Sequence, residues 1–212
     1  MRRLAKIAAI AAGGAVLLGV AVATPVLAAG PPSGVANVGV GRGMAGNGMG
    51  SGCLGSIGGN AVVTPVQALT DAQRTALVRN ASEEKLAHDL YEQFAARYDT
   101  VVFDHIAAAE SNHLNAIRTL LNRYGIADPT ANTAAGKFTD AAVQTSYDQL
   151  LAKGNVSQQA ALEVGRTVET TDIDMLRTSL SGLTATDVQR VYTHLLAASQ
   201  NHLAAFEASL GR

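Results

Sequence analysis

The spacing of the helical segments constrains the fold of this chain more than any other feature. Apolar residues recur at steps of three and four, the period of a helix with one face turned toward a core. This period runs through four long segments and one short one, which cover residues 70–97, 101–124, 140–153, 157–180 and about 186–210. About three residues link the first two long segments and about four link the last two, so each pair must be antiparallel neighbours. About 30 residues link the second long segment to the third, enough to return along a helix of about 35 Å.

Local signals mark several helix boundaries. Thr70-Asp-Ala-Gln73 has the form of a capping box, and Ser157 is suited to cap the third long helix. Two boundaries stay open, because the first segment can be one helix or two helices broken near Asn80, and the last can begin at Thr184 or Thr186. No segment alternates polar and apolar residues with period two over the length of a strand. The sequence therefore predicts an all-α four-helix bundle, made of two antiparallel hairpins joined by a long crossover that contains a short extra helix.

Glu110 and His113 interrupt the apolar face of the second long helix. The other members of that face are Phe103, Ile106, Ile117, Leu121 and Tyr124. Polar side chains at core-facing positions carry a desolvation cost unless something satisfies them. A Glu and a His three residues apart on one inward face can offer a carboxylate oxygen and an imidazole nitrogen to a metal ion. The alternative is a buried Glu–His hydrogen bond without a metal.

The other three long helices also carry metal-ligand side chains on their apolar faces. His202 lies on the inward face of the last helix, Glu169 and Asp172 lie one turn apart on the third, and the first supplies Glu83 and Glu84. Carboxylates crowded in a low dielectric repel one another and raise their own pKa values, whereas two divalent cations cancel their charge. Ligation by carboxylate and imidazole favours iron or manganese over a closed structural zinc site. The sequence predicts a site for two such ions, and a site for a single ion remains the alternative.

Four segments of the chain match a known family in their pattern of ligand-type residues. These segments are Glu83-Glu-Lys-Leu-Ala-His-Asp-Leu-Tyr91, Ala109-Glu-Ser-Asn-His113, Val168-Glu-Thr-Thr-Asp-Ile173 and Ser199-Gln-Asn-His-Leu-Ala-Ala-Phe206. On these residues the chain, from about Thr70 to Leu210, resembles the ferritin-like superfamily and, within it, an uncharacterised prokaryotic branch that is a domain of unknown function. The resemblance implies a ferritin-like bundle and a site for two iron or two manganese ions.

The resemblance also assigns ligands, with two open questions. Glu110, His113 and Glu169 match the pattern, and a first-helix Glu seven residues before a Tyr matches Glu84 and Tyr91. Helical periodicity instead places Glu83 nearer the centre of the apolar face, so both neighbouring glutamates stay candidates.

The fourth long helix departs from the family pattern. It should carry a second Glu-x-x-His, but Ser199 stands in the Glu position before His202. Asp172, on the neighbouring helix, could replace the missing carboxylate. If it does not, the second ion is weakly held and the site can be mononuclear.

The family implies chemistry with oxygen or peroxide, or oxidation of ferrous iron, with an external reductant for sustained turnover. On that interpretation Tyr91 hydrogen-bonds a ligand or takes part in radical transfer, although a structural Tyr is the simpler reading. Two alternatives stay open: a metal-binding module of the envelope without turnover, and a metal-free structural or interaction bundle. His88, His105 and His194 are expected at the rim or surface rather than among the ligands.

The N-terminal third of the sequence reads differently. Residues 1–28 have a basic start, an uncharged apolar run and small residues before Ala28, which predicts a cleaved signal peptide and a secreted, periplasmic or envelope location. An uncleaved membrane anchor is the alternative. Residues 29–64 read as a Gly-rich tether ahead of a helical domain at 65–212. Met44, Met49 and Cys53 in the tether are soft ligands for monovalent copper, or incidental residues of a linker.

Charge and cysteine content narrow the partners further. The net charge is −1 and basic residues do not cluster, so nucleic acid is not an expected partner. The single cysteine excludes an internal disulfide, so the domain must be held together by packing or by metal. The sequence leaves the oligomeric state open, a homodimer included.

Overall fold

The structure is a computed structural model that describes residues 67–211. The predicted signal peptide, the predicted tether and its copper-binding candidates Met44, Met49 and Cys53 lie outside the described residues. Within that range the chain is all-helical, with five helices and no strand. The helices are α1 (Asp71–Arg97), α2 (Val101–Arg123), α3 (Ala141–Gly154), α4 (Gln158–Leu180) and α5 (Thr186–Leu210). None of the helices in this range is long and apolar enough to cross a bilayer.

Capping by side chains explains where several helices begin. The Thr70 hydroxyl accepts from the Gln73 amide at 3.2 Å, and the Gln73 side chain accepts from the Thr70 amide at 2.9 Å, which is the predicted capping box. Ser157 caps α4 by accepting from the Ala160 amide at 3.1 Å. The last long helix begins at Thr186, without a side-chain cap.

The first long helix does not break at Asn80. It runs without interruption for 27 residues, and the Asn80 side chain is fully buried. The Asn80 amide lies 2.8 Å from the Ala76 carbonyl and 3.2 Å from the Tyr192 hydroxyl on α5. Because the side-chain nitrogen of Asn80 finds partners inside the core, the polar residue does not interrupt the helix.

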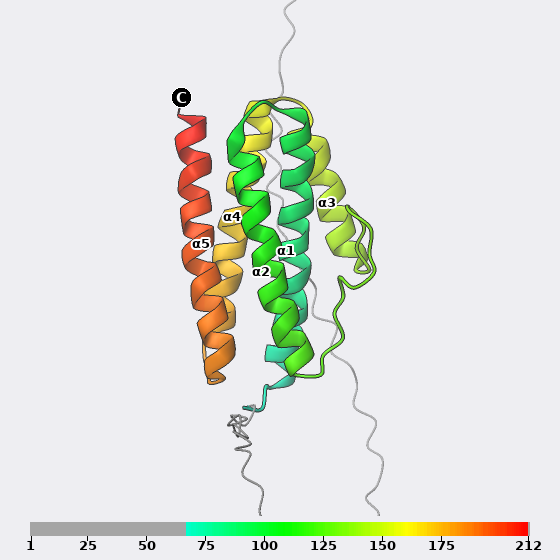
Figure 1. Ribbon diagram of the computed structural model, residues 1–212, viewed down its shortest axis with the longest axis vertical. Coiled ribbons are helices and arrows are strands. Elements are labelled where there is room, and N and C mark those ends of the chain that lie inside the picture. Colours follow the sequence, from blue (N-terminus) through cyan, green and yellow to red (C-terminus); the bar gives the residue numbers. More distant parts are fainter. Residues whose placement is uncertain (1–66, 212) are drawn as a thin grey trace, which may run out of the picture. The chain divides into compact units, whose positions relative to one another are not determined.

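The four long helices lie side by side, with the shorter α3 on the outside (Figure 1). α1 packs along α2, and α4 packs along α5, as the two short links require. α1 also contacts α4, α2 contacts α5, and α3 packs against α1 and α4. Gly165 of α4 permits a close approach to α5, because a Cβ atom there would lie 2.6 Å from the Phe206 ring.

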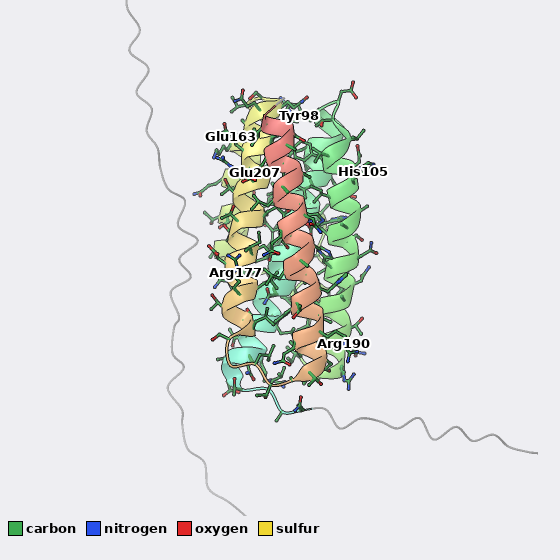
Figure 2. The ribbon with its side chains drawn as sticks, turned by 90° about the vertical axis from the view of Figure 1, so that its left-hand side faces the viewer. Tyr98, His105, Glu163, Arg177, Arg190 and Glu207 are labelled. Carbon is green, nitrogen blue, oxygen red and sulfur yellow. The ribbon has the colours of Figure 1, made fainter. Side chains whose placement is uncertain are left out.

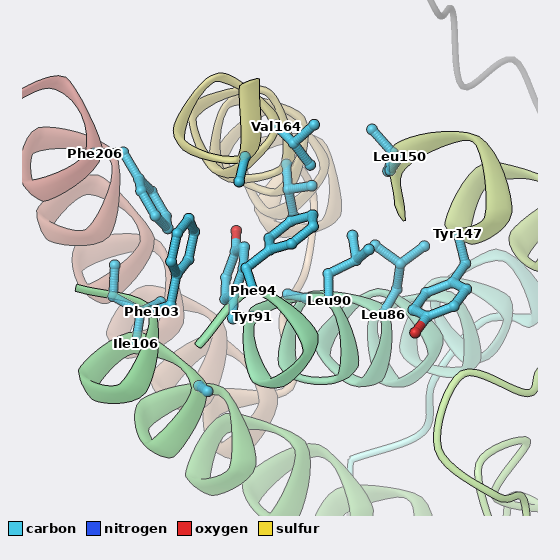
Figure 3. Packing of buried hydrophobic residues seen from close by; sticks show 14 of the residues in the cluster. Leu86, Leu90, Tyr91, Phe94, Phe103, Ile106, Tyr147, Leu150, Val164 and Phe206 are labelled. Carbon is cyan, nitrogen blue, oxygen red and sulfur yellow. The ribbon is translucent and has the colours of Figure 1, made fainter. Parts of the chain in front are cut away.

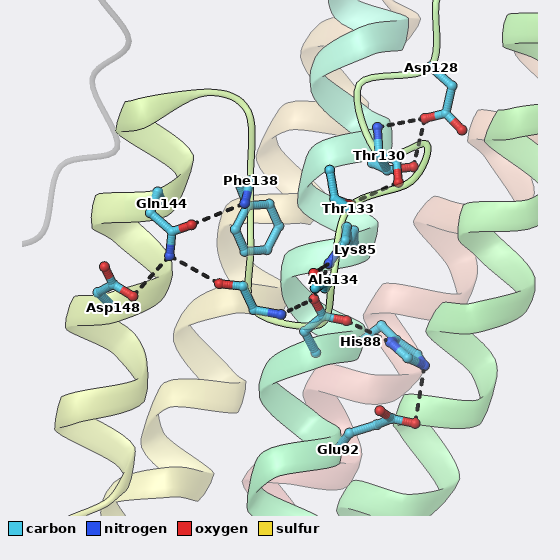
Figure 4. A network of polar contacts seen from close by, with 12 residues as sticks. Lys85, His88, Glu92, Asp128, Thr130, Thr133, Ala134, Phe138, Gln144 and Asp148 are labelled. Atoms are coloured by element: carbon cyan, nitrogen blue, oxygen red, sulfur yellow. Dashed lines mark hydrogen bonds and ion pairs between the residues drawn. The ribbon is translucent and has the colours of Figure 1, made fainter.

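The crossover from α2 to α3 is tied to α1 through Lys85 and Asp89, two residues of α1 that form a buried ion pair with each other (Figure 4). The Lys85 ammonium donates to the Ala134 carbonyl at 3.0 Å, and Asp89 accepts from the Gly136 amide at 2.8 Å. These bonds satisfy two backbone groups of a loop that has no secondary structure of its own. The returning chain is therefore anchored to the helix that carries the first candidate ligands.

Two apolar clusters fill the interior, and they are separate. The first is rich in aromatic residues and includes Tyr91, Phe94, Phe103 and Phe206, with ring centroids 5.2 to 6.2 Å apart (Figure 3). The second is rich in leucine and lies toward the other end of each long helix. Its largest members are Leu77, Leu121, Leu176, Tyr192 and Leu195. On every long helix, the polar residues predicted as ligands fall in the sequence between members of the two clusters.

Candidate metal centre

A layer of buried and half-buried polar side chains lies between the aromatic and leucine-rich clusters, and we call it the polar layer. Its members are Glu84 of α1, Glu110 and His113 of α2, Glu169 and Asp172 of α4, and Ser199 and His202 of α5. Glu84, Glu110 and Glu169 are each only 2% exposed. Carboxylates are almost never this deeply buried without a partner, so the layer must be satisfied by something.

Two sets of three side chains in this layer could each hold a metal ion. Glu84, Glu110 and His113 form the first, and Glu110, Glu169 and His202 form the second. Within each set the ligand atoms lie within 4.8 Å of one another. Glu110 belongs to both sets and therefore lies between them. Among the described residues no other side chains form such a set.

The contacts in the two sets are short. The Nδ1 atom of His113 lies 2.7 Å from Oε2 of Glu110 and 3.4 Å from Oε2 of Glu84. The Nδ1 atom of His202 lies 2.8 Å from Oε1 of Glu110 and 3.7 Å from Oε2 of Glu169. The two imidazole rings stack with centroids 5.5 Å apart. One carboxylate thus joins two imidazoles, using a different oxygen for each.

Several buried atoms of the layer have no hydrogen-bond partner. They are Oε1 of Glu84, Oε1 of Glu110, Oδ1 of Asp172 and Nδ1 of His202. The last of these is 2.8 Å from Glu110 and yet is not aligned with it as a hydrogen bond. Unpartnered buried polar atoms are rare in proteins and costly. His113 and Glu110 do form a hydrogen bond, but the four atoms without a partner are carboxylate oxygens and an imidazole nitrogen, the ligand types that suit a divalent cation.

Burial and mutual repulsion hold protons on part of the layer. Burial raises the pKa of Glu84 well above its usual value, and the nearby Asp172 and Glu110 carboxylates raise it further. Burial also raises the pKa values of Glu169 and Asp172, each to about 7. Three acidic groups in one buried space thus resist ionisation, as like charges in a low dielectric must.

The pKa values of Glu110 and His202, at the centre of the layer, shift in the direction that favours the charged form. Burial alone would raise the pKa of Glu110, but its contacts with His113 and His202 outweigh burial and lower it to about 2. Burial alone would lower the pKa of His202, but the carboxylates of Glu110 and Glu169 raise it to about 10. Glu110 is therefore the anionic centre of the layer.

The two adjacent glutamates of α1 lie in different places. Glu84 belongs to the first set, whereas Glu83 is half-buried and belongs to neither. Glu83 does line a cavity of about 10 Å³ that Glu84 and Asp172 also line. That volume is about the size of a single water molecule, so the cavity is too small for an organic substrate.

The remaining predicted residues are placed as follows. Tyr91 is fully buried and donates a hydrogen bond to Oε1 of Glu169 at 2.8 Å. Burial and the Glu169 carboxylate raise the pKa of Tyr91, which keeps the phenol in its donating form. His88 is half-buried and contacts Asp89, and His105 and His194 are exposed (His105 is labelled in Figure 2). None of these three histidines belongs to either set.

Ser199, which stands in the Glu position of the family pattern, also lies in the layer. Its hydroxyl lies 2.6 Å from Oδ2 of Asp172, although the two residues are on different helices. The signal available in the sequence was its position, three residues before His202, where α2 has Glu110 three residues before His113.

The fold and the polar layer define an all-helical protein with a buried carboxylate–histidine cluster that could hold a metal. The chain belongs to the family of uncharacterised protein domains DUF2202, whose model matches residues 73–212. It is 34% identical to the uncharacterised protein MJ0754 of Methanocaldococcus jannaschii over 142 residues, which are 67% of this chain and 77% of that protein. It is also similar to the crystal structure of hypothetical protein MJ0754 from Methanococcus jannaschii DSM 2661, with a TM-score of 0.68 and 33% identity over 70% of this chain and 85% of that one. None of these descriptions states an activity.

Proposed function

We propose that the domain is a ferritin-like four-helix bundle that binds two divalent iron or manganese ions and uses them in chemistry with oxygen or peroxide, or to oxidise ferrous iron. The observation that carries the proposal is Glu110, which is shared by two carboxylate–imidazole sets drawn from all four long helices. The arrangement of two antiparallel helix pairs with a long crossover supports the ferritin-like assignment.

The proposed ligand sets follow the geometry. Glu84 and His113 would hold the first ion, Glu169 and His202 would hold the second, and Glu110 belongs to both sets. Bound iron or manganese would supply electrons to oxygen or peroxide and accept them again from an external reductant. The chain holds the ligands in position, keeps the layer dry between two apolar clusters, and offers space only for a small molecule.

Tyr91 has a positioning role in this proposal. Its donated bond to Oε1 of Glu169 leaves the other oxygen, Oε2, on the side of His202. A hydrogen bond to one oxygen of a ligating carboxylate fixes its orientation and tunes how strongly it binds. The phenol is close enough to the layer for radical transfer, but a positioning role requires only the bond that is present.

The location of the protein is proposed from sequence alone. The predicted signal peptide of residues 1–28 would direct the domain to a secreted, periplasmic or envelope location, with the Gly-rich stretch at 29–64 ahead of it. On this proposal the domain meets oxygen or peroxide outside the reducing cytoplasm.

Metal analysis of the purified full chain tests the proposal. We expect two equivalents of iron or manganese after anaerobic loading with Fe²⁺ or Mn²⁺, and none in a Glu110→Ala, His113→Ala double variant. A matched control replaces an exposed acid and an exposed histidine on the same helix, Asp104→Ala and His105→Ala, and should keep both equivalents. A wild-type chain that binds neither metal would leave a metal-free structural network as the function of the layer.

A second measurement separates catalysis from metal binding alone. The ferrous-loaded chain should consume oxygen or peroxide faster than free Fe²⁺ at the same concentration. Equal rates would favour a metal-binding module without turnover.

A further inference from the structure

The two helix pairs carry the same pattern of ligands with one exchange. In the pair α1 and α2, Glu84 lies beside Glu110 and His113. In the pair α4 and α5, Glu169 takes the place of Glu84, and His202 takes the place of His113. The residue three before His202 is Ser199, whereas the residue three before His113 is a glutamate. The second pair therefore lacks a carboxylate on its second helix.

The second pair has an additional carboxylate on its first helix. Asp172 lies three residues after Glu169, and the equivalent position in the first pair, three residues after Glu84, is Ala87. Asp172 and Ala87 line the same small cavity. Compared with the first pair, the second pair has its second carboxylate on the first helix instead of the second, and each pair has the same number of acidic groups.

Ser199 makes direct contact with the relocated group. Its hydroxyl is 1% exposed and lies 2.6 Å from Oδ2 of Asp172. The same hydroxyl lies 3.0 Å from the Leu195 carbonyl, but it has one proton, and a bond to a carboxylate is the stronger of the two. The other oxygen, Oδ1, is buried and has no partner. One oxygen of Asp172 is fixed and the other is free for a ligand.

We infer that Asp172, held in place by the Ser199 hydroxyl, is the carboxylate that completes the second metal set with Glu169 and His202. The inference rests on the proposed function, because it assigns a ligand to that same site. Assigning Asp172 as a ligand also balances the charges of the carboxylates and the two cations. Asp172 lies outside the two sets of three but lines the same cavity as Glu84, Glu110 and Glu169. It brings the carboxylates of the polar layer to four, whose total charge equals that of two divalent cations when both histidines are neutral.

Binding of Mn²⁺, and of Fe²⁺ without oxygen, to the metal-free full chain tests the inference by equilibrium dialysis and elemental analysis. Asp172→Asn and Ser199→Ala should each keep one tight equivalent and weaken the second at least tenfold, the usual effect of losing a ligand or its hydrogen-bonded support. Ser82→Ala is the matched control, because Ser82 is also buried and its hydroxyl bonds the Val78 carbonyl four residues earlier rather than a carboxylate. This variant should bind both equivalents.

A relocation variant gives a result that loss of stability cannot imitate. Asp172→Ala combined with Ser199→Glu moves the carboxylate back to α5 and should bind the second equivalent within tenfold of the wild type, with unchanged circular dichroism. Two equivalents with unchanged affinity in both single variants would overturn the inference while leaving the proposed function intact. A folded relocation variant with only one equivalent would overturn it as well. A wild-type chain without bound metal would overturn the proposed function and the inference together.

Discussion

The metal-free protein should lose stability as the pH rises from 5 to 8. Glu169 and Asp172 have pKa values of about 7 in the folded chain, above the usual values of 4.5 for Glu and 3.8 for Asp. A carboxyl group whose pKa is raised by folding stabilises the fold fully below its unfolded pKa, and that contribution is lost as the pH rises through the folded pKa. Each pKa unit corresponds to about 1.4 kcal/mol, so each group should remove about 2 kcal/mol over this range. His202, whose pKa is raised to about 10, acts in the same direction above its usual value.

Urea unfolding followed by circular dichroism measures this effect. With a chelator present, the free energy of unfolding should fall by about 4 kcal/mol between pH 5 and pH 8. With Mn²⁺ or Fe²⁺ bound, the loss should disappear, because the cations neutralise the carboxylates and bind more tightly as protons leave. The double variant Glu169→Gln, Asp172→Asn should lose this part of the pH dependence without metal and keep only the part that Glu84 and His202 contribute. Metal-free wild-type protein that is equally stable or more stable at pH 8 would refute the reasoning.

Four further substitutions test other parts of the structure. Tyr91→Phe should keep both metal equivalents and lower the free energy of unfolding by about 1 kcal/mol through the lost hydrogen bond, measured by urea titration. Glu84→Gln should remove one equivalent in equilibrium dialysis, whereas Glu83→Gln should keep both, and the reverse result would exchange the roles of the two residues. Gly165→Ala should destabilise the fold by about 1–3 kcal/mol despite the better helix propensity of alanine, because its Cβ would meet the Phe206 ring; a raised melting temperature would contradict this.

The helices and their order could be predicted from the sequence because helix signals are local. The capping residues Thr70 and Ser157 lie within one turn of the amides they bind, so their pattern is visible in a few residues. Asn80 shows the limit of such reasoning. Its polarity suggested a break, but its partners are a hydroxyl on α5 and a carbonyl of its own helix, and the former is 112 residues away. No local pattern contains that contact.

The candidate site could also be predicted from the sequence only in part. Helical period and spacing brought Glu110, His113, Glu169 and His202 to one layer, because residues on one face of a helix must point together. Whether these groups bind a metal stays a prediction. The choice between the two adjacent glutamates of α1 depends on a rotation of one residue, about 100° around the helix axis, which periodicity alone does not resolve.

The bond between Ser199 and Asp172 could not be read from either helix alone. It depends on how far α4 and α5 approach one another and on the rotamers of two short side chains. The sequence showed only that one helix lacks an expected carboxylate and that the neighbouring helix has an additional one.

The position of the polar layer, between two separate apolar clusters, has a consequence for how the helices align. Sliding one long helix along its neighbours by a single turn, about 5.4 Å, would push its carboxylates among phenylalanine or leucine side chains. Burying an unpaired charge there costs several kcal/mol, far more than such a shift would cost in a uniformly apolar interior. The polar layer therefore permits only one axial register of the four long helices.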